Sequence, residues 1–141
     1  MSSHCRFLHD LPVRALSALL LGATLANGAA AQAQPAAAGY PAAAVRFLDG
    51  ELPQMEAAVA ARDRDYFEHA MGRTVDFSGT WGFRTRANPA LAPYASCTEA
   101  VSDFTIVGLC RIAPSLDGCD PVLATRFDSN LRHCRDLAAG R

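Results

Sequence analysis

The sequence has 141 residues, with 13 basic and 14 acidic side chains and a formal net charge of −1. This balance argues against nucleic-acid binding and against attachment to an anionic membrane surface, because both need a concentrated positive surface. The sequence contains no lysine, which excludes a lysine Schiff base or a lysine general base. The alanine-rich, arginine-only composition is typical of a GC-rich bacterial genome.

The first 33 residues have the three parts of a secretory signal peptide. Two arginines precede an apolar run, and its most hydrophobic part, 16–25, is too short to span about 30 Å of hydrocarbon as a helix. Two Ala-x-Ala cleavage sites follow, and the mature chain begins at Gln34 or, with the other site, at Gln32. We expect a signal peptide over 1–33 and a periplasmic or secreted product with no membrane anchor after cleavage.

The mature chain is predicted to begin with a flexible lead-in, 34–40, and to continue as a single helical domain over 41–141. A first helix is expected from Pro41, because proline's missing N–H would lack a partner in a first turn anyway. Gly50 and Pro53 interrupt the pattern of this segment without shifting its phase, so a kink or short break is expected near 49–52. Apolar residues recur there at steps of three and four, which marks one helical face. They are Val45, Leu48, Leu52, Met55 and Val59.

A second helix is predicted from Asp63 to about Ser78, with apolar residues at steps of four. The following stretch, 78–93, contains two glycines, an asparagine and two prolines. These residues favour turns and interrupt helices, so the stretch is expected to be mostly loop.

This loop holds the single tryptophan of the chain, Trp81, together with Phe83, Arg84 and Arg86. Tryptophan and arginine are enriched at binding hot spots, and loops carry binding residues more often than cores do. We therefore take these four as the candidate binding residues. In the alternative arrangement, Trp81 and Phe83 fold back to cap the helical core, and the two arginines stay exposed to meet an acidic partner.

Two more helices are predicted in the last third of the chain. One runs over Tyr94–Arg111, although the β-branched and apolar residues at 105–107 would tolerate a strand. The other begins at Pro121, with Asp120 as its N-cap, and ends at Gly140. Its apolar face consists of Leu123, Phe127, Leu131, Cys134 and Ala138.

Four of the five cysteines lie after residue 96, and an even number in a small exported domain indicates a disulfide framework. Cys97 and Cys110 are 13 positions apart on one predicted helix, about 20 Å, whereas bonded cysteines need Cα atoms within about 7 Å. In an antiparallel pair of helices, two residues at the same height lie opposite each other, one on each helix. The sum of their sequence numbers is nearly constant along the pair. Pairing Cys97 with Cys134 and Cys110 with Cys119 gives sums of 231 and 229, and the crossed pairing gives 216 and 244. We predict the first pairing.

Together these elements predict an all-α fold, a small bundle of about four helices whose C-terminal hairpin is cross-linked by the two disulfides. The sequence has no Cys-x-x-Cys pair, so thioredoxin-like exchange, ribbon-type zinc and covalent haem have no support. No segment matches a calcium-binding loop. We expect no metal and no cofactor.

A catalytic role would fall to His69, oriented by Asp65 or Glu68 as the base of a small exported hydrolase. No Gly-x-Ser-x-Gly nucleophile motif accompanies it, and acidic residues near a helix start are favoured by the helix dipole alone. We therefore expect a protein without enzymatic activity, a binding or inhibitory module for a protein partner in the cell envelope or outside the cell. The hydrolase and a structural envelope component are the alternatives.

Overall fold

The computed structural model describes residues 34–84, 86–115 and 119–141. The predicted signal peptide lies outside the described residues. In the described part, the secondary structure comprises four α-helices and two short 3₁₀-helices, with no strand. This confirms the all-α fold class. None of the described helices is long and apolar enough to cross a membrane.

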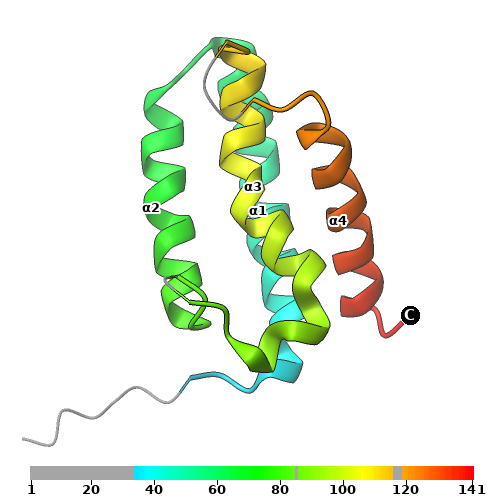
Figure 1. Cartoon of the computed structure of the whole chain (residues 1–141). Coiled ribbons are helices and arrows are strands. Elements are labelled where there is room, and N and C mark those ends of the chain that lie inside the picture. Colours follow the sequence, from blue (N-terminus) through cyan, green and yellow to red (C-terminus); the bar gives the residue numbers. More distant parts are fainter. Residues whose placement is uncertain (1–33, 85, 116–118) are drawn as a thin grey trace, which may run out of the picture. The chain divides into compact units, whose positions relative to one another are not determined.

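The four helices run alternately up and down, so that neighbours in the chain are antiparallel (Figure 1). The centre is formed by α1 (Tyr40–Ala61) and α3 (Ala95–Ile112). They are flanked on one side by α2 (Asp65–Thr80) and on the other by α4 (Leu123–Ala138). The largest interface joins α3 to α4, and α1 packs against both, whereas the contacts of α2 with α1 and α3 are smaller.

Both predicted disulfides are present. The Cys97–Cys134 bridge joins the first turn of α3 to the last turns of α4, with a Cα–Cα distance of 4.7 Å, and both cysteines are fully buried. The Cys110–Cys119 bridge, with a Cα–Cα distance of 5.5 Å, joins the end of α3 to the connection that precedes α4. The two bridges therefore lie toward opposite ends of one antiparallel hairpin.

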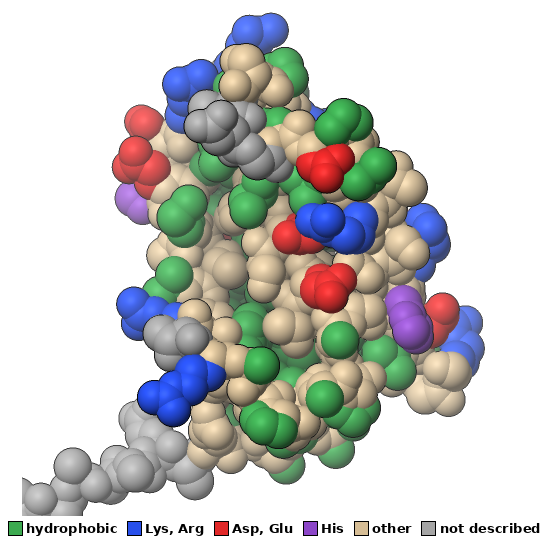
Figure 2. Space-filling model, in the orientation of Figure 1, with side chains coloured by type: hydrophobic (Ala, Val, Ile, Leu, Met, Phe, Trp, Pro, Cys, Tyr) green, Lys and Arg blue, Asp and Glu red, His purple; other side chains and the backbone are tan. Residues whose placement is uncertain are grey.

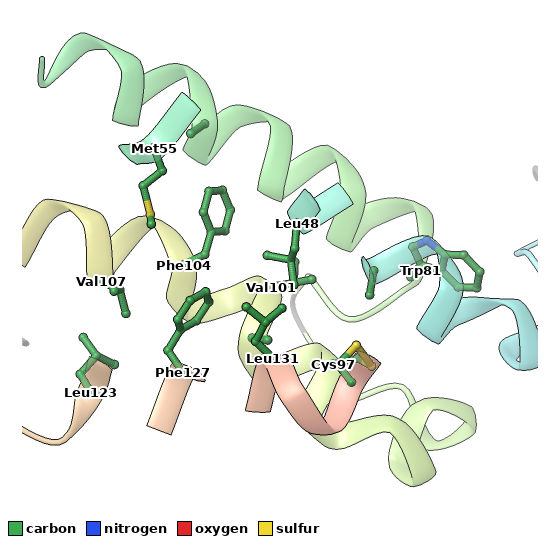
Figure 3. Packing of buried hydrophobic residues seen from close by; sticks show 14 of the residues in the cluster. Leu48, Met55, Trp81, Cys97, Val101, Phe104, Val107, Leu123, Phe127 and Leu131 are labelled. Atoms are coloured by element: carbon green, nitrogen blue, oxygen red, sulfur yellow. A yellow bond between two sulfur atoms is a disulfide. The ribbon is translucent and has the colours of Figure 1, made fainter. Parts of the chain in front are cut away.

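The hydrophobic core fills the space between the helices of this hairpin and α1 (Figure 3). Phe104 of α3 and Phe127 of α4 lie next to each other in its middle, and Leu48 and Met55 reach it from α1. The buried face of α4 consists of Leu123, Phe127, Leu131 and Cys134, which are four of the five residues predicted for it; the fifth, Ala138, is half-buried.

The first helix has no break near 49–52, because α1 is continuous through Gly50 and Pro53. Pro53 has no N–H to donate to the Asp49 carbonyl, yet the Gln54 side chain donates to the next carbonyl, that of Gly50, at 2.9 Å. The buried face also differs from the predicted one, because Glu51 is buried whereas Leu52 is half-buried. The buried residues of α1 are Tyr40, Pro41, Ala44, Leu48, Glu51, Met55 and Ala58.

The other helix boundaries differ from the predicted ones by one or two residues. Asp63 precedes α2 rather than belonging to it, and its carboxylate accepts the backbone N–H of Asp65 at 3.0 Å. Asp120 likewise accepts the Val122 N–H at 2.9 Å, so it caps a turn just before α4 begins at Leu123. The segment 105–107, which would tolerate a strand, is helical.

Gly108 allows α2 to approach α3 closely. A Cβ atom built on Gly108 would lie under 3.0 Å from the ring of Phe67 and the side chain of Met55. Phe67 is only 1% exposed, so its ring has little room to move away. The space that a side chain at position 108 would occupy is therefore filled by Phe67, the main buried apolar residue of α2.

We predict that Gly108→Ala lowers the free energy of unfolding by about 1–3 kcal/mol, because the added methyl group overpacks the core. Gly72→Ala is the matched control, since a Cβ at this helical glycine would meet nothing within 4 Å. It should raise stability by about 0.5–1 kcal/mol through helix propensity. Urea unfolding measures both variants, and equal stabilities would contradict the close packing of Phe67 on Gly108.

Candidate functional site

The loop predicted to bind a partner begins with a Schellman motif at the end of α2. Gly82 has a φ of +73°, in the left-handed region that favours glycine. Its N–H donates to the Gly79 carbonyl at 3.2 Å. The Phe83 N–H donates to the Ser78 carbonyl at 2.9 Å, which completes the motif. The chain thereby turns back on the bundle, and the ring centroids of Phe83 and Phe77 are 6.4 Å apart.

Trp81 is a core residue in this arrangement. It is 7% exposed, and its ring centroid lies 5.1 Å from that of Tyr40. Phe83 is half-buried beside the same tyrosine, at 5.7 Å. Burial raises the pKa of Tyr40 to about 12, so its hydroxyl stays protonated and donates to Thr98 Oγ1 at 3.2 Å. The structure thus has the alternative arrangement, with Trp81 and Phe83 folded back on the core.

A pocket of about 250 Å³ opens at this end of the bundle, and we call it the loop-pole pocket. It is lined by Phe83, by the 3₁₀-helix Pro89–Tyr94 and by the start of α3, where Thr98 and Glu99 lie. Most of the remaining lining is small or apolar. These residues are Ala87, Asn88, Pro89, Leu91, Ala92 and Ala95.

Asn88 fixes the backbone between the loop and the 3₁₀-helix. Its Nδ2 donates to the Trp81 carbonyl at 2.8 Å, and its Oδ1 accepts the Ala90 N–H at 3.0 Å. Both ends of the amide are therefore used to hold backbone. These two hydrogen bonds tie the start of the 3₁₀-helix to the end of α2.

Arg84 and Arg86 are exposed next to this pocket. Each is a chain neighbour of a lining residue, Phe83 in one case and Ala87 in the other. The ion pairs found among the described residues involve neither of them. Figure 2 shows basic side chains on the surface beside the end of α2, where this loop lies. The structure therefore places Phe83 in the pocket lining, leaves Arg84 and Arg86 exposed one residue away from lining positions, and buries Trp81 in the core.

The residues of the hydrolase alternative lie elsewhere. His69, Asp65 and Glu68 are all exposed on α2. His69 lines neither the loop-pole pocket nor the two grooves described below. Glu68 lies at the edge of one of those grooves, and Asp65 is in the first turn, where the helix dipole favours an acidic residue.

Two shallow grooves follow the helix interfaces. A groove of about 560 Å³ runs along α2 beside Leu109 of α3, and Met71, which is 50% exposed, lines it. Figure 2 shows apolar side chains in the hollow between these helices. A second groove, of about 420 Å³, lies between α1 and α4 and has the Glu56–Arg111 ion pair on its rim. Neither contains a candidate residue from the sequence except Glu68.

Sequence reasoning missed a buried ionic network between α1 and α2. Glu51 accepts hydrogen bonds from Arg73 Nε at 2.5 Å and Arg73 Nη2 at 2.8 Å, and the Tyr66 hydroxyl donates to its Oε2 at 2.9 Å. The Arg73 guanidinium also lies over the Tyr66 ring, 5.6 Å from its centroid. The Glu51 carboxylate is satisfied inside the protein and joins α1 to α2, whereas the Arg73 side chain is 42% exposed.

The charges of this network shift the pKa values of its members. Hydrogen bonds from Arg73 hold the pKa of Glu51 below its ordinary value, against burial, which acts in the opposite direction. Burial and the neighbouring carboxylate raise the pKa of Tyr66 to about 12.

A signal for the burial of Glu51 was present in the sequence, because Glu51 lies three residues after Leu48 and four before Met55, in phase with the buried face.

Within the described ranges, no group of three or more His, Cys, Asp or Glu side chains is placed to hold a metal ion. Comparison with known proteins found no family model, no curated protein and no solved structure that matches the chain. The geometry that bears on function lies at the end of the bundle that carries the loop-pole pocket, and we call this end the loop pole.

We predict that Glu51→Gln lowers the free energy of unfolding at pH 7 by about 1–2 kcal/mol, because a buried acceptor of charged hydrogen bonds loses its charge. Glu56→Gln is the matched control: its bidentate pair with Arg111 joins side chains that are 57% and 43% exposed, and such pairs contribute less than about 1 kcal/mol.

The same variants give a pH dependence with a defined sign. The pKa of Glu51 is lower in the folded state than its ordinary value of 4.5, so its contribution is complete at neutral pH and is lost as pH falls through the folded-state pKa. The stability difference between the wild type and Glu51→Gln should therefore shrink in acid. Chemical unfolding at pH 7 and at several pH values below 4.5 tests this, and a difference that grows in acid would contradict it.

Proposed function

We propose that the protein is an exported binding or inhibitory module without enzymatic activity, and that a protein partner in the envelope or outside the cell docks at the loop pole. The observation that carries the proposal is the pair of exposed arginines, Arg84 and Arg86, beside a half-buried Phe83 and an apolar pocket. Aromatic anchors next to arginine are a common composition of binding hot spots.

A rigid scaffold supports this proposal, because a surface that is already ordered loses little conformational entropy on binding. The Schellman motif and Asn88 hold the two ends of the loop, and the Cys97–Cys134 bridge holds the first turn of α3. Export is proposed from the leader sequence. The two disulfides and the lack of a described helix that could cross a membrane are compatible with the periplasm or the extracellular space.

The two alternatives have less support. A hydrolase based on His69 with Asp65 or Glu68 would need a concave site around the imidazole, and His69 is exposed outside the three hollows described above. A purely structural envelope component does not account for a pocket flanked by arginines that make no ion pair with any other described residue.

The proposal predicts that Arg84→Glu combined with Arg86→Glu reduces capture of the partner at least tenfold and leaves the thermal midpoint unchanged. Immobilised, oxidised protein, with residues 1–33 removed, would be cross-linked to an envelope extract, and the captured protein would be identified by mass spectrometry. Arg132→Glu on α4 is the control, since Arg132 is also exposed and also lacks an ion pair among the described residues.

Equal capture by the wild type and the double variant would overturn the assignment of the loop pole. His69→Ala supplies the enzymatic arm of the experiment. It should leave capture unchanged, and loss of a hydrolytic activity in this variant with intact folding would favour the hydrolase instead.

A further inference from the structure

The size of the loop-pole pocket restricts what it accepts. Its volume of about 250 Å³ is below the roughly 300–1,000 Å³ that small-molecule and cofactor sites occupy. It has room for one aliphatic or aromatic side chain. Phe83 and Leu91 supply apolar lining, and Leu91 is only 3% exposed. The pocket therefore suits an apolar anchor that projects from a larger partner.

The charge beside the pocket restricts the anchor's neighbours. Arg84 follows Phe83 and Arg86 precedes Ala87, so the Cα atom of each arginine lies about 3.8 Å from that of a lining residue. Arginine side chains extend far enough to reach groups beside an anchor in the pocket. A guanidinium presents a planar fork that binds a carboxylate through two hydrogen bonds. Acidic residues next to the anchor would thus meet two arginines.

The part of the lining that belongs to α3 has a different polarity. Glu99 accepts a hydrogen bond from Asn130 Nδ2 at 2.8 Å through one carboxylate oxygen, Oε2. Thr98 Oγ1 accepts a hydrogen bond from the Tyr40 hydroxyl, so that bond does not use the hydrogen of the Thr98 hydroxyl. This part of the lining can accept a backbone N–H through Glu99 and would repel an acidic side chain. An acidic segment would therefore bind with its carboxylates away from Glu99 and toward the exposed arginines of the loop.

We infer that the loop-pole pocket takes one apolar side chain of an acidic, extended peptide segment of the partner, whose carboxylates pair with Arg84 and Arg86. This inference rests on the proposed function and adds the chemistry of the partner to it. The charge of the loop favours a peptide of this kind over a neutral or basic one, because exposed guanidinium groups attract carboxylates and repel cations.

The test uses a defined probe, an acetylated pentapeptide amide with one leucine between two pairs of acidic residues. Two-dimensional NMR of the folded, oxidised protein should show shifts at Phe83, Ala87 and Leu91 on titration. The same peptide with glycine in place of leucine, and a peptide with basic residues in place of the acidic ones, should bind at least tenfold more weakly.

Ala95→Leu, which fills the pocket from the start of α3, should weaken binding of the acidic leucine peptide at least tenfold, and so should Arg84→Gln with Arg86→Gln. Ala124→Leu makes the same change in the groove between α1 and α4 and should have no effect. Glu99→Gln should leave binding equal or tighter, because it removes a negative charge from the pocket lining.

Peptide-induced shifts confined to α2 would overturn the inference, as would equal binding of the leucine and glycine peptides or no effect of Ala95→Leu. The partner-capture experiment distinguishes failure of the anchored-peptide inference from failure of the proposed binding function. If Ala95→Leu captures the partner normally while Arg84→Glu with Arg86→Glu does not, the binding role holds and the anchored peptide is wrong. If neither variant affects capture, both fail.

Discussion

The Cys97–Cys134 bridge is the constraint on which the rest of the structure depends. It joins residues 37 positions apart in the sequence and is fully buried where α3 begins and α4 ends. In the chain-entropy model, a loop of this length contributes about 4 kcal/mol by restricting the unfolded chain, which is a large share of the stability of a domain this small. The bridge sets the register of the hairpin, and with it the position of Ala95, Thr98 and Glu99, which form the α3 wall of the loop-pole pocket.

The other wall is held without covalent bonds. This wall comes directly after α2 in the chain, and the described contacts of α2 include no disulfide. Instead, α2 is held by Phe67, which packs over Gly108, and by the hydrogen bonds that Arg73 and Tyr66 donate to Glu51. Helices with smaller interfaces open at lower free-energy cost than the rest of a domain. The loop pole therefore joins a covalently fixed wall to one whose position depends on packing and one ionic network. That difference explains why the loop needs its own anchors, the Schellman motif at Gly82 and the amide of Asn88.

The features that the sequence predicted well depend on repeated spacing. The face of α4 follows from residues four apart, and the disulfide pairing follows from the length of a helix and the geometry of a hairpin. Glu51 was missed because Leu52, one position later, also satisfies the apolar periodicity, and only the packing of α2 decides between them. The position of Phe83 beside Tyr40 depends on one left-handed residue, Gly82, at which the chain turns back. The loop-pole pocket was beyond sequence reasoning because its lining, all within 83–99, forms a hollow only when the loop, the 3₁₀-helix and the start of α3 fold against one another.

Disulfide mapping tests the hairpin register most directly. Digestion of the oxidised, unreduced protein with trypsin and Asp-N separates the four cysteines, because cleavage before Asp103 divides Cys97 from Cys110. The structure predicts that the peptide 87–102 is linked to 133–135, and that 103–111 is linked to 117–119. A linkage between 87–102 and 117–119 would contradict the hairpin, and with it the position of the α3 wall at the loop pole.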